Sequence, residues 1–467
     1  MRGRLVKNIS ANILQQVINQ LFGLIIFYIL SRDLNKEAFG EINWCLAFLL
    51  TSFTILSFGL DQLTIKKIAA GENPSSVLSL YLTHSGIAGL LFYGLTAIVY
   101  LLFPLHTLLL PILLLGIGKL MIFFSMPFKQ AAIGLEKFPL FASMSVVSNI
   151  IRGTALIVGS VFYTLNINLI IFIFIAGDAA ELLMSVVFYY RTIKIPVKIS
   201  FNKQAYKILL KEAFPQIGIV LSTSVMARFD WLFIGLMIST VQLAEYSFAY
   251  KVFEISTLPM LVIAPILIPR FVKHFQQKKK NSEEIYALIK IEMIICMLVI
   301  VLINIAWVPI IDTITGGKYG AANSNTIFIL SLCTPLLYLN NVLWTAGFAQ
   351  GNLRSIFFII SITCCLNIAG DCLFIPLFKK EGAAAAYLLA LIIQTILYFK
   401  KEHSISFSKV SYNITTCILS GILSIYIIKQ NIKSAPLSIL SGIILYATFV
   451  LLSQKLKAKI ENKYNIA

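Results

Sequence analysis

The chain has 467 residues, of which 58% are hydrophobic and only 12% are charged, and its mean hydropathy is +0.88. Soluble globular proteins carry about 25% charged residues, so this composition excludes that class. Apolar runs of about 20 residues, the length that spans a bilayer as a helix, recur along the whole sequence. The alternating polarity of a membrane β-barrel is absent. The sequence therefore predicts an all-α polytopic membrane protein.

About fourteen transmembrane helices are expected in chain order, and every connection is short except two, at about 191–212 and 273–288. The expected spans are 8–31, 39–63, 77–103, 107–128, 139–164, 168–190, 213–238, 246–272, 289–315, 322–346, 354–377, 382–400, 410–428 and 434–453. We predict two six-helix lobes, at 1–200 and 201–402. Two additional helices and a basic cytoplasmic tail follow at 403–467.

The distribution of basic residues predicts the orientation of the spans. The formal net charge is +18, with 38 Lys and Arg against 20 Asp and Glu. With the start of the chain in the cytoplasm, 27 of the 38 basic residues lie in or beside cytoplasmic segments and seven in outward loops. Cytoplasmic loops of membrane proteins carry the excess of Lys and Arg, so both termini are expected in the cytoplasm. The basic charge is thus a topology signal, and nucleic acid is not an expected partner.

A short segment repeats at an offset of 217 residues. Residues 134–137 (Gly-Leu-Glu-Lys) correspond to 351–354 (Gly-Asn-Leu-Arg), and Gly153 corresponds to Gly370. Each lobe has an even number of spans, so both lobes start on the same side of the membrane. The repeat must then be parallel, with its axis along the membrane normal. Two such lobes that face each other across a central cavity form an alternating-access transporter.

The remaining four basic residues lie inside predicted spans. They are Lys119, Arg152, Arg228 and Lys251. A cation near the bilayer centre costs roughly 3 kcal/mol or more, so we expect a cavity that receives an anionic ligand. Arg152 is the first candidate for binding phosphate, because a guanidinium can bind two phosphate oxygens at once. The alternatives are an ion pair of Arg152 with Asp178 and a local pair of Lys251 with Glu254, three residues away on the same helix face.

Amide side chains form polar stripes on the first and fifth predicted spans. In the first span, Asn12, Gln16 and Asn19 recur at helical spacing, and in the fifth, Asn149 precedes Arg152 by three residues. Unpaired amides are unfavourable in lipid, so these stripes must face protein or a cavity. Two interpretations stay open: hydrogen bonds between helices, or a cavity wall that contacts sugar hydroxyls.

Four acidic side chains in the spans are candidates for ion coupling: Asp178, Glu181, Glu254 and Asp371. A buried carboxylate can load and release a proton as a cavity switches sides, whereas pairing with a basic residue would make it structural. Nucleotide-binding and zinc-protease motifs are absent from the sequence. We therefore expect no catalytic residue, no metal and no cofactor, and a protein that is not an enzyme.

Three segments of the N-terminal third carry a resemblance. They are the polar-striped first span, residues 30–34 (Leu-Ser-Arg-Asp-Leu) with 37–40 (Glu-Ala-Phe-Gly), and residues 57–62 (Ser-Phe-Gly-Leu-Asp-Gln). The chain resembles the polysaccharide-transport (Wzx-type) flippases of the multidrug/oligosaccharidyl-lipid/polysaccharide (MOP) exporter superfamily. The loop after the first span departs from that family's usual Ala-Arg-Val-Leu-Gly at three positions: Ser31, Asp33 and Asn35.

The resemblance implies a MATE-like fold and a flippase that moves undecaprenyl-diphosphate-linked oligosaccharide repeat units, of O-antigen or a similar surface polysaccharide, across the bacterial inner membrane. Alternating access coupled to an ion gradient is the implied mechanism. The implied partners are this lipid-linked oligosaccharide and membrane lipids, with a polysaccharide polymerase and a chain-length regulator as further candidates.

Two alternatives are weighed against the flippase. A MATE-type multidrug or cation exporter is disfavoured, because four cations inside the spans oppose a cationic substrate. A membrane polysaccharide polymerase would be expected to use a sizeable outward loop, and none is predicted.

Overall fold

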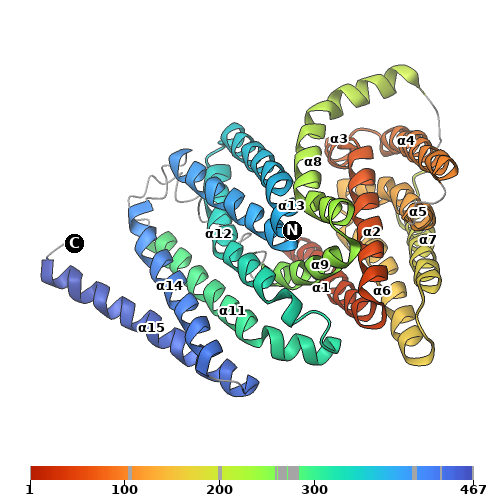
Figure 1. The fold of residues 1–467 in the computed structure, drawn as a ribbon. Coiled ribbons are helices and arrows are strands. Elements are labelled where there is room, and N and C mark those ends of the chain that lie inside the picture. Colours follow the sequence, from red (N-terminus) through yellow and green to blue (C-terminus); the bar gives the residue numbers. More distant parts are fainter. Residues whose placement is uncertain are drawn as a thin grey trace. The chain divides into compact units, whose positions relative to one another are not determined.

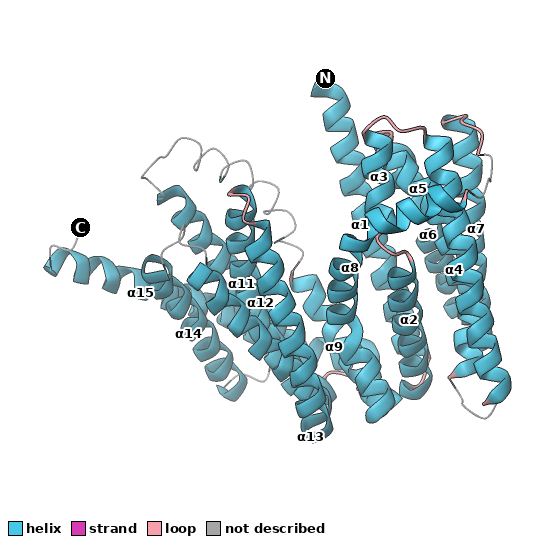
Figure 2. Ribbon diagram, turned by 90° about the horizontal axis from the view of Figure 1, so that it is seen from above, coloured by secondary structure: helices cyan, strands magenta, loops and turns pink. Residues whose placement is uncertain are grey.

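The structure, a computed structural model, describes residues 2–103, 108–197, 202–257, 283–401, 407–431 and 434–464, together with Met260 and Phe271. Every regular element in these residues is a helix, as Figure 2 shows. The chain divides into two compact units, Met1–Gly235 and Leu236–Ala467. The predicted all-α fold is therefore confirmed, while the predicted boundaries of the lobes stay a prediction.

Eleven helices in the described residues are long and apolar enough to cross a membrane. One of these candidate spans, Arg354–Lys401, contains two of the predicted spans, because its helix turns at Lys379, where φ is 55° and ψ is −132°. Part of the predicted span 246–272 lies outside the described residues. The protein is thus a multi-pass membrane protein, whereas the count of fourteen spans and the side of the two termini stay predictions.

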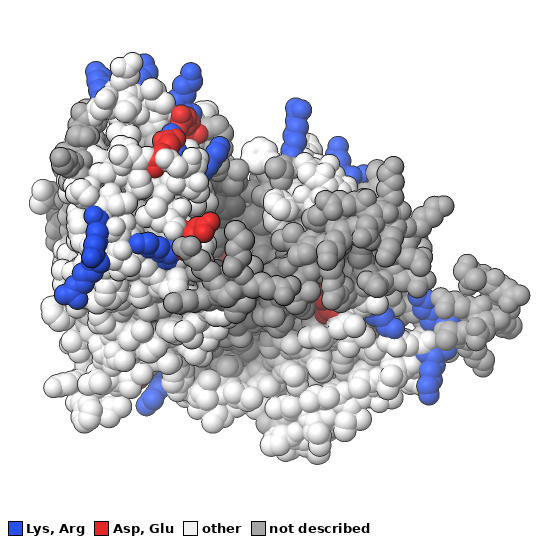
Figure 3. All heavy atoms as spheres, turned by 180° about the vertical axis from the view of Figure 1, so that it is seen from behind, with Lys and Arg blue, Asp and Glu red and all other residues white. Residues whose placement is uncertain are grey.

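Apolar side chains on the surface fit a lipid environment. Helix α4 (Pro74–Leu102) leaves Leu91, Leu95 and Leu101 69%, 62% and 75% exposed. Figure 3 shows one face of the molecule, on which the described charged side chains are few and most of the surface belongs to other residues. Contiguous apolar surface of this kind is unfavourable in water and is stable against hydrocarbon chains.

The first unit is built from helices α1 to α8, which Figure 1 labels. Besides α4, they are α1 (Arg2–Asp33), α2 (Lys36–Leu56), α3 (Leu60–Ala69), α5 (Leu109–Gly134), α6 (Phe138–Phe162), α7 (Ile167–Thr192) and α8 (Lys203–Met237), whose last two residues belong to the second unit. Helix α7 packs along both α5 and α6, and α6 also packs along α1. The three helices α5, α6 and α7 thus form one bundle.

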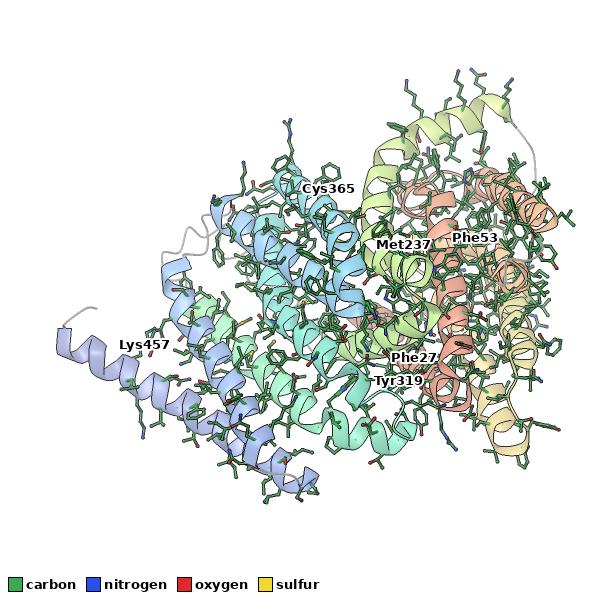
Figure 4. The ribbon with its side chains drawn as sticks, in the orientation of Figure 1. Phe27, Phe53, Met237, Tyr319, Cys365 and Lys457 are labelled. Atoms are coloured by element: carbon green, nitrogen blue, oxygen red, sulfur yellow. The ribbon has the colours of Figure 1, made fainter. Side chains whose placement is uncertain are left out.

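Aromatic side chains connect the neighbouring helices of this unit. Phe27 of α1 meets Phe39 of α2 edge to face, with ring centres 5.0 Å apart. Phe53 of α2, labelled with Phe27 in Figure 4, contacts Phe92 of α4 and Phe123 of α5, each at 5.3 Å. Such offset pairs contribute about 0.5–1.5 kcal/mol each beyond the area that they bury. They hold α2 against α1, α4 and α5.

The predicted span 39–63 is wrong at its C-terminal end, because α2 stops at Leu56. Phe58 and Gly59 have φ values of 57° and 74°, in the left-handed region that ends a right-handed helix. A separate helix, α3, begins at Leu60. Its Asp61 accepts hydrogen bonds from the Tyr81 hydroxyl at 2.5 Å and from the Gln130 amide at 3.2 Å. The segment 57–62 is therefore a turn followed by the start of α3, whose Asp61 side chain connects this helix to Tyr81 and Gln130.

An ion-pair network outside the candidate spans attaches α3 to α8. The ammonium of Lys67 lies 2.8 Å from Glu212 of α8 and 3.0 Å from Glu72. Burial alone would lower the pKa of Lys67, but its hydrogen bonds to the two carboxylates outweigh that effect and raise the pKa. Lys67 therefore stays charged, and the beginning of α8 is held to the first unit.

In the second unit, α11 forms the centre of the packing. Its elements are α9 (Thr240–Ser256), α11 (Glu283–Thr315), the 3₁₀ turn η1 (Ala321–Asn323), α12 (Ser324–Ala349), α13 (Leu353–Lys401), α14 (Phe407–Asn431) and α15 (Ala435–Tyr464). Helix α11 packs along α12, α14 and α15, and α12 packs along α13. In the turn between α11 and η1, Tyr319, labelled in Figure 4, stacks on Phe248 of α9 with ring centres 4.4 Å apart. The two last helices thus share a core with α11.

The two segments of the predicted repeat lie in two similar turns, between α5 and α6 and between α12 and α13. The predicted correspondence of Gly134 with Gly351 is wrong by two residues, because the position equivalent to Gly351 is Glu136. The backbone N–H groups of Lys137 and Asn352 each donate to the carbonyl five residues earlier, at 2.8 and 3.0 Å. The residue before each is left-handed: Glu136 has φ 56° and Gly351 has φ 81°. Both helices therefore end in a Schellman-type cap.

Candidate functional site

Five charged side chains are buried together between α5, α6 and α7. We refer to them as the charge cluster: Lys119, Lys129, Arg152, Asp178 and Glu181. Their exposed fractions lie between 1% and 8%. With all five ionised, three cations face two carboxylates, so the cluster carries one positive charge in excess.

Asp178 of α7 is the centre of the cluster. Its carboxylate forms an ion pair with the Arg152 guanidinium, lies 3.3 Å from the Lys119 ammonium and accepts a hydrogen bond from Ser148 at 3.1 Å. Arg152 also donates through Nε to the Phe174 carbonyl at 3.4 Å, and its guanidinium lies 4.7 Å from the centre of the Phe174 ring. Of the two alternatives for Arg152, the structure contains the ion pair with Asp178, and the phosphate-binding role stays a prediction.

A second ion pair joins Lys129 of α5 to Glu181 of α7. The sequence placed Lys129 in the cytoplasmic connection after the span 107–128. That placement is wrong, because α5 continues to Gly134 and keeps Lys129 buried. The signal that could have found it is the turn that begins at Gly134, since a helix that reaches this turn must include Lys129.

Two glycines leave the space that the charged side chains of the cluster occupy. A Cβ atom at Gly118 of α5 would lie 2.5 Å from an Asp178 carboxylate oxygen, and one at Gly177 of α7 would lie 2.7 Å from the Arg152 side chain. Real Cβ atoms do not approach other heavy atoms so closely. The absence of a side chain at these positions therefore lets the charged groups sit between closely packed helices.

Replacing Gly118 by alanine should displace the Asp178 carboxylate and destabilise the protein by about 1–3 kcal/mol, the usual cost of overpacking. The measurement is thermal unfolding of the purified protein in detergent. Gly94→Ala in α4 is the matched control, because a Cβ atom there meets nothing within 4 Å. Equal unfolding temperatures for the Gly118 and Gly94 variants would contradict this account of the cluster.

The two polar stripes meet between α1 and α6. The Asn149 amide donates to the side-chain oxygen of Asn19 at 3.0 Å. Gln16 is exposed, and the side chain of Asn12 lies outside the described residues. For Asn19 and Asn149 the structure contains the hydrogen bond between helices, one of the two interpretations left open by the sequence. A sugar-binding role for these amides stays a prediction.

The other predicted site residues lie outside the charge cluster. Arg228 of α8 is half-buried, with its guanidinium 4.4 Å from the centre of the Trp231 ring. In α9, the Lys251 ammonium lies 2.6 Å from Glu254, so the expected local pair is present.

Asp371 of α13 is buried and accepts a hydrogen bond from Asn367 at 2.7 Å. The ligand-binding and coupling roles of Arg228, Lys251, Glu254 and Asp371 remain predictions.

Sequence reasoning missed two buried acidic sites in the second unit. Glu245 of α9 pairs with Lys380 of α13, which also donates to the Ala322 carbonyl at 2.7 Å. Glu292 of α11 is only 2% exposed. Glu245 and Lys380 lie in connections between predicted spans, and Glu292 lies near the start of the predicted span 289–315, so none of them was expected to be buried. Within the described part of the chain, no three His, Cys, Asp or Glu side chains are grouped as a metal ion requires.

Comparisons with known proteins concern the family and the fold of the chain. The family described as polysaccharide biosynthesis protein matches residues 5–275, more than half of the chain. The structure is similar to that of the lipid II flippase MurJ in an inward closed conformation, with a TM-score of 0.73 and 14% identity over 95% of this chain and 99% of that one. No curated protein sequence matches the chain.

Two further solved structures share the fold. An inward-facing multidrug resistance MATE family transporter of the MOP superfamily has a TM-score of 0.66 and 14% identity, covering 90% of this chain and 99% of that one. A MOP superfamily transporter from Pyrococcus furiosus has a TM-score of 0.57 and 12% identity, covering 85% and 95%. At such low identities the likeness concerns the fold alone, which is of the MurJ and MATE type.

Proposed function

Because the chain belongs to the polysaccharide biosynthesis protein family, we propose that it is a flippase that translocates a lipid-linked oligosaccharide. The substrate is an undecaprenyl-diphosphate-linked repeat unit of O-antigen or a similar surface polysaccharide. It moves from the cytoplasmic to the outer leaflet of the bacterial inner membrane. The observation that carries this proposal is the burial of three basic side chains with only two carboxylates in the cluster, which lies within the part of the chain that matches the family.

The charge cluster supports an anionic substrate. A cation inside a low-dielectric membrane protein is stable only beside a negative group. The cluster contains three cations and two carboxylates, so a diphosphate headgroup supplies the missing negative charge. Arg152 suits this role because its fork of N–H donors matches two phosphate oxygens. Lys119 contributes a second positive charge beside the same carboxylate. The buried cations meet the headgroup in a second conformation of the transport cycle.

Competition for Arg152 supplies a mechanism of ion coupling. In this structure Asp178 occupies both Arg152 and Lys119. Protonation of Asp178 removes its negative charge, and the cluster then carries two positive charges in excess. The proton and the anionic headgroup therefore favour each other's binding and are transported together, so the outward movement is driven by the substrate's own concentration difference between the leaflets and is opposed by an inward proton gradient. When Asp178 loses the proton, its carboxylate competes for the two cations again and releases the headgroup.

The cation exporter is the second candidate, since a MATE transporter shares the fold. For the Pyrococcus furiosus transporter, reverse polarity of the binding pocket suggests a different function. The same reasoning applies here, because a cluster with excess positive charge repels a cationic drug. The polarity of the buried cluster thus favours the flippase over the exporter.

The proposed function is tested in two systems. A strain that lacks the protein should accumulate the lipid-linked repeat unit in the cytoplasmic leaflet, and its sugar composition identifies the substrate. Purified protein in liposomes should move a fluorescent undecaprenyl-diphosphate saccharide between leaflets faster than liposomes without protein. Absence of both effects would contradict the flippase, and cationic drug efflux in the same liposomes would favour the exporter.

A further inference from the structure

Glu292 of α11 is a buried carboxyl group outside the charge cluster. It lies within the candidate span Ile289–Thr315, and its side chain is 2% exposed. Neither carboxyl oxygen has a hydrogen-bond partner among the residues that the structure describes. Every other buried carboxylate named above has a cation or a hydrogen-bond donor beside it. Glu292 therefore differs in kind from Asp178, Glu181, Glu245 and Asp371.

The surroundings of Glu292 are an apolar core. On α11, its neighbours Ile289, Met293 and Cys296 are at most 2% exposed and belong to the core that α11 shares with α12, α14 and α15. Lys290, two positions away, does not share the face of Glu292 and forms no ion pair with it among the described residues, although it lies within electrostatic reach of Cys417 on α14. The core face of α11 thus carries a carboxyl group at a position where its neighbours are hydrophobic.

The titratable groups that other helices bring to this core are Tyr338 of α12, Tyr398 of α13, Cys417 of α14 and Tyr446 of α15. The Tyr338 hydroxyl donates to the Ser256 carbonyl at 3.1 Å and the Tyr446 hydroxyl to the Ile294 carbonyl at 3.1 Å, and no hydroxyl of the described core donates to Glu292. None of these groups is basic. The described core therefore offers Glu292 neither a counter-ion nor a free hydroxyl donor.

These apolar surroundings determine the protonation state of Glu292. An ionised carboxylate in such surroundings costs several kcal/mol, and no cation offsets that cost. A buried group in this position takes up a proton and becomes neutral. Glu245, which is 7% exposed, avoids this outcome because the Lys380 ammonium lies beside it. Glu245 and Glu292 can therefore be compared directly, because both are buried and only Glu245 has a cation beside it.

We propose that Glu292 is a proton-binding site of the second unit. Its carboxylic acid holds a proton in this conformation and releases it when the core of α11, α12, α14 and α15 opens to water. This inference goes beyond the proposed function, because it concerns a carboxyl group of α11, whereas the charge cluster belongs to α5, α6 and α7. The ligand is the proton itself, and the site gives a proton gradient a second point of action.

Infrared spectroscopy of the purified full-length protein in lipid nanodiscs tests the proposal without any transport assay. At neutral pH, wild type should show the carbonyl stretch of a protonated carboxylic acid, and this band should shift in deuterated water. The difference spectrum between wild type and Glu292→Gln should contain that band. Glu245→Gln is the matched control, since the ionised Glu245 contributes no acid band and its replacement should leave the band unchanged.

A difference spectrum between wild type and Glu292→Gln that lacks an acid band would overturn the proposal. If Glu292→Gln fails to insert, Glu292→Asp replaces it, and a shifted band is then expected, while an unchanged band would overturn the proposal. Because the readout is a vibration of one carboxyl group, its failure would leave the flippase proposal untouched. Failure of lipid translocation, in turn, would leave the infrared result standing.

Discussion

Replacing Arg152 by alanine should lower the rate of lipid-linked oligosaccharide translocation by at least about 30-fold while the protein still inserts into the membrane. Removing one partner of a buried, hydrogen-bonded charge pair costs about 2–5 kcal/mol in binding. The loss is large because Arg152 is the one guanidinium of the cluster and is only 7% exposed. The measurement is the translocation rate of a fluorescent undecaprenyl-diphosphate saccharide in liposomes that contain equal amounts of inserted protein.

A double variant separates binding from structure. If Arg152 only neutralises Asp178, then Arg152→Ala combined with Asp178→Asn removes both charges of the pair and should restore translocation to the rate of Asp178→Asn alone. If Arg152 binds the diphosphate, the double variant should stay as inactive as Arg152→Ala. Arg152→Lys keeps the charge but loses the planar fork, and we expect intermediate activity. A double variant as active as Asp178→Asn alone would mean that the phosphate assignment is wrong.

The second large effect is expected for Asp178→Asn, which imitates the protonated carboxyl group. Arg152 and Lys119 then lose their shared counter-ion, so inorganic pyrophosphate should bind about tenfold more tightly, within the usual range of coupling between sites. Translocation should become slower, because the anion is no longer expelled, and independent of the proton gradient. Calorimetric binding of pyrophosphate and translocation with and without an imposed pH gradient are the measurements.

Glu181→Gln is the matched control for this variant. It adds the same positive charge to the cluster, but it frees Lys129 and leaves the Arg152 pair with Asp178 in place. We therefore expect a smaller gain in pyrophosphate affinity and a retained dependence on the proton gradient. Equal behaviour of the two variants would show that total charge, and not competition at Arg152, governs binding. Gradient-dependent translocation by Asp178→Asn would rule out Asp178 as the coupling group.

The candidate site illustrates how far sequence reasoning reaches. Arg152 and Asp178 were both recognised as anomalies inside apolar spans, and their pairing was one of the stated alternatives. Lys129 was missed because a hydropathy window ends a span where charge begins, whereas α5 continues to Gly134. Glu292 was missed because its depth was unknown, and a carboxyl near the end of a span meets water unless other helices cover it.

The sequence by itself determined that this is an all-helical, multi-pass membrane protein of the polysaccharide biosynthesis family. Insertion into lipid depends on the length and hydropathy of each segment separately, and these are local properties of the chain. Only the tertiary structure decided which buried charges have partners. A counter-ion lies on another helix, as with Lys129 and Glu181, so pairing depends on how far each helix is rotated and shifted against its neighbours. The close approach that Gly118 and Gly177 permit fixes that geometry for α5, α6 and α7. In the second unit, the packing of α11 against its own neighbours places Glu292 in a core whose described residues include no cation.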